Sequence, residues 1–392
     1  MNSYIKNISS ICLIFIIMTQ TEKAEAQWSV KNTFVLENVD MIHSALYLAS
    51  GNEILITDNK GNLLKINSED GEVVWQKFIA TPDNYMSNSD VILLAVSHDG
   101  ELAAISERQW NGAGPSYLHI YSVNSREKLY SIRENSNYYF KYYENKEDLR
   151  CPGVNNSNPK DNTCVMHPYF AAFTSNGNLI TAWENYASTF GLYDRSFKFY
   201  SASFKKIWDW QVVSDVNPQE RAGFFHSLPA PVITEISEGK YIYGDCEIDI
   251  RTLTRQKIEA IKSVNVATQV PGEIFQKSSL AENAGISNII LIDKYLYVFA
   301  YESGGQGYYA VFDISTKKPV VQWTSSSSAY RMAVNKSGTR IALNGSGCDI
   351  FEALTGNKEF YIDRADFVDF NPNNENELFS TYGNEITIYK KD

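Results

Sequence analysis

The sequence predicts an all-β protein, a seven-bladed β-propeller made of repeated four-stranded units. Three observations lead to this fold class: short apolar strands recur along the chain, glycine-centred turns separate them, and amphipathic helical periodicity is rare. Aromatic residues make up 13% of the 392 residues, a content that suits a large core between β-sheets.

The repeat is clearest between Met41 and Phe78. This segment predicts four strands, namely Ile42–Ala49, Glu53–Thr57, Asn62–Asn67 and Glu72–Phe78. Turn signals separate them at Ser50-Gly51-Asn52, Asn59-Lys60-Gly61 and Glu69-Asp70-Gly71. Four antiparallel strands joined this way form one propeller blade. The first strands of the six later units are expected to begin at Asp90, Pro168, Pro231, Ser287, Tyr330 and Asp366.

The last unit contains only three predicted strands. The segment Trp28–Val39 alternates apolar and polar residues and precedes the first unit. We expect it to complete the last blade and so close the ring, because closure removes the open sheet edges that promote aggregation.

The first 26 residues predict a cleaved signal peptide. Lys6 precedes the short apolar run Ile11–Met18, and Ala24-Glu25-Ala26 fits a cleavage site. The run is short for a transmembrane helix, although an uncleaved anchor is the alternative. We therefore expect one mature domain, residues 27–392, that is secreted or periplasmic and not inserted in a membrane.

The net charge of the chain argues against two classes of partner, and its cysteines predict one disulfide. A formal net charge of −11 without basic clusters argues against binding to nucleic acid or to anionic lipid. Cys151 and Cys164 flank a loop rich in Pro and Asn, and in an oxidising compartment they are expected to form a disulfide; two reduced thiols are the alternative. Cys246 and Cys348 occupy matching points of non-adjacent units and are expected to stay unpaired.

The connections are unequal on the two faces of the predicted ring. Turns between first and second strands, and between third and fourth strands, share one face and are short. The long connections share the other, which we call the loop-bearing face: Glu107–Ser116, Glu134–Met166, Asn185–Thr189, Ser214–Leu228, Asn265–Ala284 and Glu302–Gly307. Long loops are often functional, so this face is the expected binding surface. Tolerance of insertions without function is the alternative.

Aromatic residues mark the longest insertion, residues 134–166. It carries Tyr138, Tyr139, Phe140, Tyr142 and Tyr143, and Trp110 lies in a neighbouring loop. Tyr and Trp are enriched at protein interfaces because they give a large contact area at little cost in entropy. These residues are the predicted binding residues for a protein or peptide; packing of the rings onto the blades is the alternative.

Three histidines, His43, His167 and His226, fall at or just before the first strands of three units. Together they could bind a metal such as zinc or supply a general base. The simpler interpretation is coincidence, since their offsets to the following turns differ, and no cofactor is expected. His98 in a turn and His119 in a strand have no predicted role.

Two segments, Asp70–Trp75 and Leu354–Lys358, are similar to the turn between third and outermost strands in WD40-like and quinoprotein-like propellers. The resemblance implies the fold and no catalytic residues. Two functions follow as hypotheses. The first is a non-catalytic scaffold that binds a protein or peptide. The alternative is a hydrolase, lyase or lactonase-like enzyme with its site at the channel mouth, and an accessory subunit of a periplasmic redox complex is a third possibility.

Overall fold

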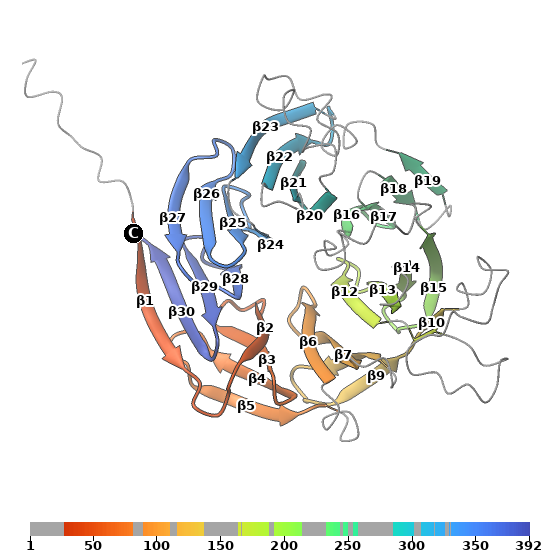
Figure 1. Cartoon of the computed structure of the whole chain (residues 1–392), viewed down its shortest axis with the longest axis horizontal. Coiled ribbons are helices and arrows are strands. Elements are labelled where there is room, and N and C mark those ends of the chain that lie inside the picture. Colours follow the sequence, from red (N-terminus) through yellow and green to blue (C-terminus); the bar gives the residue numbers. More distant parts are fainter. Residues whose placement is uncertain are drawn as a thin grey trace, which may run out of the picture.

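Four-stranded antiparallel sheets stand around a central axis and form a ring (Figure 1). The computed structural model describes residues 27–80, 89–109, 116–136, 164–165, 167–187, 192–213, 233–243, 246–249, 254–257, 285–301, 307–316, 318–325, 329 and 331–392. The described residues contain strands and turns but no helix. In this part of the chain, accordingly, no helix is long and apolar enough to cross a membrane. The chain is an all-β β-propeller.

The first three sheets, in chain order, take up the first half of the sequence. The first contains β2 (Ile42–Tyr47), β3 (Glu53–Asp58), β4 (Asn62–Asn67) and β5 (Val73–Phe78). The second contains β6 (Ser89–Val96), β7 (Leu102–Gln109), β8 (Tyr117–Ser122) and β9 (Lys128–Ile132). The third contains β12 (His167–Phe173), β13 (Leu179–Ala187), β14 (Leu192–Tyr200) and β15 (Lys206–Val213).

The remaining sheets follow the same pattern. One contains β16 (Ile233–Ser237), β17 (Lys240–Tyr243), β18 (Cys246–Asp249) and β19 (Thr254–Lys257). The next contains β20 (Gly285–Ile292), β21 (Tyr295–Tyr301), β22 (Gly307–Asp313) and β23 (Lys318–Ser325). It is followed by β24 (Arg331–Val334), β25 (Arg340–Asn344), β26 (Cys348–Glu352) and β27 (Lys358–Ile362). The last contains β28 (Phe367–Phe370), β29 (Glu377–Tyr382), β30 (Glu385–Lys391) and β1 (Trp28–Val35).

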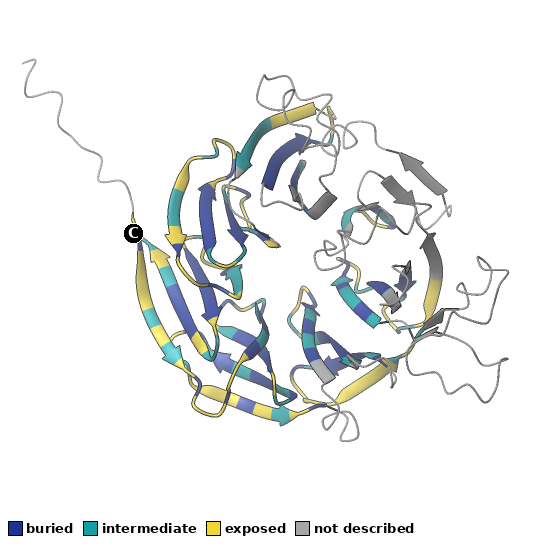
Figure 2. Cartoon of the chain, viewed as in Figure 1, coloured by how far each residue is buried: buried dark blue, intermediate teal, exposed yellow. Residues whose placement is uncertain are grey.

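Burial changes with distance from the axis. The first strand of each sheet lies nearest the axis and the last lies at the rim (Figure 1). Figure 2 shows the middle strands mostly buried and the described outermost strands mostly exposed. Strand β9 is exposed at four of its five residues, whereas β22 is buried throughout. This gradient places the apolar core between neighbouring sheets.

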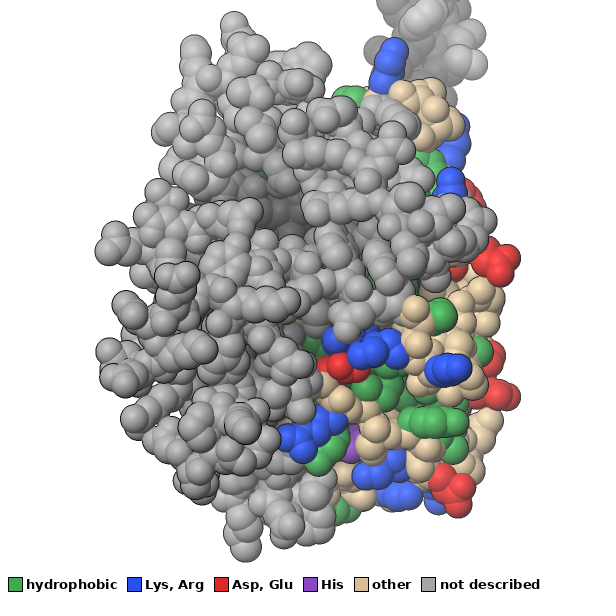
Figure 3. Space-filling view, turned by 90° about the vertical axis from the view of Figure 1, so that its right-hand side faces the viewer, with side chains coloured by type: hydrophobic (Ala, Val, Ile, Leu, Met, Phe, Trp, Pro, Cys, Tyr) green, Lys and Arg blue, Asp and Glu red, His purple; other side chains and the backbone are tan. Residues whose placement is uncertain are grey.

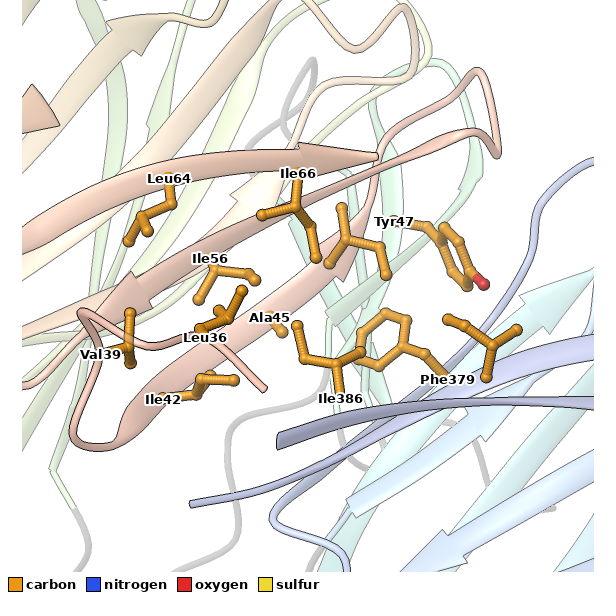
Figure 4. Close-up of a cluster of buried hydrophobic side chains, with 12 residues drawn as sticks. Leu36, Val39, Ile42, Ala45, Tyr47, Ile56, Leu64, Ile66, Phe379 and Ile386 are labelled. Carbon is orange, nitrogen blue, oxygen red and sulfur yellow. The ribbon is translucent and has the colours of Figure 1, made fainter. Parts of the chain in front are cut away.

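One buried cluster joins the first and last sheets (Figure 4). Ile42 and Tyr47 of β2 and Ile56 of β3 pack with Phe379 of β29 and Ile386 of β30. The Tyr47 and Phe379 ring centroids are 5.0 Å apart. Residues from opposite ends of the sequence therefore share one core.

Strand β1 also pairs antiparallel with β30, from Trp28 opposite Lys391 to Val35 opposite Glu385. The Trp28 indole N–H donates to Glu359 Oε2 at 3.0 Å. The same carboxylate accepts from Lys391 at 2.7 Å and from Arg340 at 3.1 Å. Burial alone would raise the pKa of Glu359, but the hydrogen bonds from Lys391 and Trp28 and the charges of Arg340 and Lys391 lower it below the usual range. This carboxylate of β27 therefore ties β1 and β30 to the neighbouring sheet of β24–β27.

Hydrogen bonds also run between innermost strands of consecutive sheets. The Leu93 backbone N–H donates to Ser44 Oγ at 2.6 Å, and the Leu291 N–H donates to Thr234 Oγ1 at 3.2 Å. Between the last sheet and the first, the Tyr47 N–H donates to Asp369 Oδ2 at 3.2 Å. The Asp369 carboxyl thus accepts the same kind of hydrogen bond between sheets that the Ser44 and Thr234 hydroxyls accept elsewhere in the ring.

The glycine turns fall where the sequence predicts them. A left-handed backbone conformation, which favours glycine, occurs at Gly51, Gly71, Gly100, Gly177, Gly239, Gly338 and Gly356. Gly338 has a second constraint, because a Cβ there would lie 2.1 Å from the Tyr297 hydroxyl oxygen. That hydroxyl donates to the Gly338 carbonyl at 2.8 Å.

Several expectations need correction. The sequence predicts Lys257–Ser263 as the outermost strand of the fourth unit, but this strand is β19, Thr254–Lys257, in which Lys257 pairs opposite Cys246. The predicted loops Glu107–Ser116 and Asn185–Thr189 begin inside β7 and β13, since Glu107 to Gln109 pair with β6 and Asn185 to Ala187 pair with β14. The insertion begins and ends in an unpredicted two-stranded sheet, β10 (Asn135–Ser136) with β11 (Cys164–Val165).

Candidate functional site

Most of the predicted binding and disulfide residues are outside the described residues. These are Trp110, Tyr138, Tyr139, Phe140, Tyr142, Tyr143 and Cys151. Cys164 begins β11, and its disulfide with Cys151 stays a prediction. Cys348 is a free, buried thiol, as expected, and burial raises its pKa well above the usual range.

The start of the long insertion is fixed by a partly buried ionic network. Glu134 follows β9 and accepts hydrogen bonds from the Tyr200 hydroxyl at 2.9 Å and from Lys206 Nζ at 3.3 Å. The Lys198 ammonium lies 3.1 Å from the same carboxylate, and its side chain is 6% exposed. The blade of β12–β15 therefore holds the chain where it leaves the ring after β9.

Two of the three predicted histidines lie in described residues, but in different sheets. His43 is in β2 and His167 is in β12, so the β6–β9 sheet stands between their blades; His226 is outside the described residues. Within the described part of the chain, no group of three or more His, Cys, Asp or Glu side chains could hold a metal ion. The shared site of His43, His167 and His226 stays a prediction.

The environment of His167 favours its neutral form. Its Nδ1 lies 2.6 Å from Ser116 Oγ. Burial first, and then the positive charge of Arg108, lower the pKa of His167 to about 4. Arg108 Nε in turn donates to the Pro168 carbonyl at 3.0 Å, and Ser106 Oγ donates to the same carbonyl at 2.7 Å. This polar group joins the second blade to the third.

The described residues also include a surface group on the loop-bearing face that the sequence pattern does not predict. We call it the Arg–aromatic patch: Met41, Arg331, Arg364, Phe367 and Tyr382. Met41 precedes β2, Arg331 begins β24, Arg364 and Phe367 lie where β27 passes to β28, and Tyr382 ends β29. In the propeller topology, all these positions lie at blade-to-blade or second-to-third-strand connections.

Short contacts make this patch continuous. The Arg331 guanidinium carbon lies 4.3 Å from the centroid of the Phe367 ring, and that of Arg364 lies 5.4 Å from the Tyr382 centroid. The Gly383 N–H, next to Tyr382, donates to Asp366 Oδ2 at 3.0 Å. The Gly383 carbonyl accepts from the Ile42 N–H at 2.7 Å, which brings Met41 to the same place.

The patch combines exposure with charge. Met41 is 45% exposed and Tyr382 is 48% exposed. Water reaches the Arg331 side chain, yet surrounding protein lowers the pKa of its guanidinium, an effect that Asp366 opposes. An arginine held over an aromatic face is partly ordered before a ligand arrives, so it loses less entropy on binding.

Acidic residues sit beside these arginines. Asp363 lies 3.8 Å from the Arg364 guanidinium and is 84% exposed, and Asp40, next to Met41, pairs with Lys60 at 3.0 Å. On the side of the molecule seen in Figure 3, the described basic, acidic and apolar side chains are likewise intermixed. Such a mixture suits recognition of a protein surface better than recognition of a ligand of one charge.

Comparison with known proteins gives the fold. No family model matches the chain, and no curated protein matches it. Among solved structures, it is similar to the β-propeller domain of Cps50 (Swd1) from Myceliophteria thermophila, with a TM-score of 0.56 and 12% sequence identity. The match covers 93% of this chain and all of that domain. It confirms the predicted β-propeller architecture and, at this identity, carries no function.

Proposed function

We propose that this β-propeller is a protein-interaction scaffold that binds a protein or peptide partner on its loop-bearing face. The Arg–aromatic patch is the observation that supports this function most directly. Arg, Tyr, Phe and Met are enriched at protein interfaces, and here they occur together at the junction of three blades, where Phe367 is partly buried and the other four residues are exposed. The aromatic residues of the insertion, Tyr138 to Tyr143, and Trp110 belong to the same proposed surface.

Affinity purification with variants of the patch tests this function. The double variant Arg331→Ala, Tyr382→Ala removes one member of each cation–π pair and leaves the buried core unchanged. Leu354→Ala is the matched control, because Leu354 is 44% exposed but lies in a turn on the opposite face. A stoichiometric partner that the control retains and the double variant loses supports the proposal. A partner bound equally by both, or lost only by the control, overturns it.

The architecture proposed with this function is a seven-bladed ring in which β1 supplies the fourth strand of the last blade. The pairing of β1 with β30 and the four-stranded sheets described above support it. In this arrangement both ends of the domain meet in one blade. The loop-bearing face is then continuous around the axis.

The proposed compartment is the periplasm or the exterior of the cell. The signal-peptide pattern of residues 1–26 supports it, and those residues are outside the described ones. Determination of the first residue of the mature protein is the test. A start at Gln27 in an extracytoplasmic fraction supports export, whereas an intact Met1 in the cytoplasm contradicts it.

A further inference from the structure

A hydrogen-bonded row crosses three neighbouring strands of the second blade. Glu107 is in β7, His119 in β8 and Ser131 in β9. His119 Nε2 lies 2.8 Å from Glu107 Oε2, and His119 Nδ1 lies 2.9 Å from Ser131 Oγ. We propose that Ser131 is an activated nucleophilic serine that accepts the acyl group of a small carboxylic ester, an activity independent of partner binding.

The histidine is held in the tautomer that this chemistry needs. When Glu107 is ionised, its carboxylate can only accept a hydrogen bond, so Nε2 then carries the proton and Nδ1 offers its lone pair to the Ser131 hydroxyl. Glu107 is 1% exposed and His119 is 3% exposed, which fixes their geometry. Burial and the negative charge of Glu107 raise the pKa of the nearby Tyr121 to about 12.

Aromatic rings hold the imidazole in place. Tyr117 stacks on His119 with ring centroids 5.4 Å apart and planes 15° apart. Tyr121 meets the His119 ring edge-on at a centroid distance of 6.2 Å. The arrangement of a nucleophile, a base within hydrogen-bond reach and a buried carboxylate that orients the base is the logic of a catalytic triad, which recurs on unrelated folds.

A second serine–histidine pair in the same region shows what distinguishes Ser131. Ser116 Oγ lies 2.6 Å from His167 Nδ1, but Ser116 is fully buried. The charge of Arg108 near His167 disfavours the imidazolium that a general base must become. Ser131, by contrast, is exposed, and the ring of its histidine contacts the Glu107 carboxylate instead of lying near a cation.

The reaction needs only the groups in this row, the ester and water. Ser131 Oγ attacks the carbonyl carbon and forms a C–O bond while its proton passes to His119 Nδ1. The imidazolium, stabilised by Glu107, then gives that proton to the departing alkoxide, which leaves as the alcohol. Water, deprotonated by His119, releases the carboxylic acid and restores Ser131. Leu129, in the same strand as Ser131, is an exposed apolar residue, which favours an apolar acyl group.

A fluorophosphonate probe, which labels activated serines covalently, tests the proposal on the folded protein. We expect mass spectrometry to locate the label on Ser131, and Ser131→Ala to abolish that adduct. Ser203 is the matched internal reference, because it is exposed and its hydroxyl lies 3.0 Å from Ser201 Oγ instead of a histidine. Selective labelling of Ser131 over Ser203 supports the proposal. Equal labelling of the two, or none at Ser131, overturns it.

The variant His119→Gln separates activation from simple exposure. It keeps a polar side chain in the row but removes the base, so labelling of Ser131 is expected to fall by about 100-fold or more. Unchanged labelling in a folded variant would show that the hydrogen bonds of this row only stabilise the pairing of the strands. The comparison of Ser131 with Ser203 in the unaltered chain decides the question even where the variant does not fold. Partner binding plays no part in either measurement.

Discussion

At the scale of single residues, Asp369 couples the stability of the ring to pH. Its carboxyl faces the Tyr47 N–H between the last and first sheets. Burial raises its pKa to about 7, against smaller opposite effects of hydrogen bonds from the Tyr47 and Phe370 backbones. Because the folded state favours the protonated form, this contribution to stability is complete below about pH 4 and is lost as the pH rises to about 7.

We therefore expect Asp369→Asn to stabilise the protein above neutral pH and to have little effect near pH 4. Asparagine keeps an oxygen that can accept from the Tyr47 N–H but carries no charge to bury. Water reaches part of Asp369, so we expect a gain of about 1 to 2 kcal/mol at pH 8. Urea unfolding of both proteins from pH 4 to 8 measures the difference. A constant difference across this range would contradict the role of Asp369.

Gly338 is a second single position with a large expected effect. In Gly338→Ala the alanine must adopt a left-handed backbone conformation, which residues with a Cβ disfavour. Its methyl group would also clash with the Tyr297 hydroxyl. Gly383 is the matched control, because its φ is +61° and no heavy atom lies within 4 Å of the position that a Cβ would take there. We expect Gly338→Ala to cost about 3 kcal/mol and Gly383→Ala about 1 kcal/mol.

Thermal and urea unfolding measure these two costs, and a second variant identifies their cause. Tyr297→Phe removes the oxygen closest to the added methyl group, so it should recover part of the stability lost in Gly338→Ala. If both glycine variants cost the same, or if Tyr297→Phe and Gly338→Ala act additively, the backbone alone explains the loss.

At the scale of the elements, the stability of β1 depends on Glu359. The variant Glu359→Gln removes the negative charge that Lys391 and Arg340 share and that Trp28 contacts. We expect a loss of about 2 kcal/mol, because two partly buried cations lose their partner. Amide hydrogen exchange should become faster in β1 and β30 before it changes in β2–β5.

The control for this experiment is Glu352→Gln. Glu352 is exposed and its carboxylate accepts from the Thr355 hydroxyl at 2.6 Å, so we expect a change within about 0.5 kcal/mol. Faster exchange confined to β1, without loss of global stability, would mean that β1 pairs with β30 but does not stabilise the ring as a whole.

The local pattern of the sequence was sufficient to predict most of the fold. Glycine turns and alternating strands are local signals. They predict strands at Lys206–Val213, Tyr295–Tyr301, Lys358–Ile362 and Glu377–Tyr382, which are the bounds of β15, β21, β27 and β29. Strand β19 was misplaced because its residues, Thr254 to Lys257, are polar. An outermost strand can be polar on its exposed side, so composition alone does not reveal it.

The candidate sites could not be predicted in the same way. Arg331 and Phe367 are 36 positions apart and meet only because their blades are neighbours in the ring. The row of Glu107, His119 and Ser131 left a weak signal, since its members fall 12 positions apart in successive strands. Only the register of β7, β8 and β9 shows that the three side chains meet.

At the scale of the whole molecule, the ring and the insertion are separable. The β12–β15 blade fixes the start of the insertion through Glu134, and β10 pairs with β11 where the chain leaves and rejoins the ring. A short turn that replaces residues 137–163 would keep both features. We therefore expect the shortened protein to unfold cooperatively, with a midpoint within a few degrees of that of the full chain.

The same replacement removes the predicted binding residues Tyr138 to Tyr143, so the proposed scaffold should lose most of its affinity for its partner. The control is Glu134→Ala in the full-length chain, which keeps the aromatic residues but leaves Lys198 buried without this carboxylate. That variant should be destabilised by about 2 to 3 kcal/mol and should still bind its partner when folded. Thermal unfolding and a binding titration on both proteins separate the two roles. If the shortened protein binds with unchanged affinity, the partner contacts other parts of the loop-bearing face, and the Arg–aromatic patch becomes the main candidate.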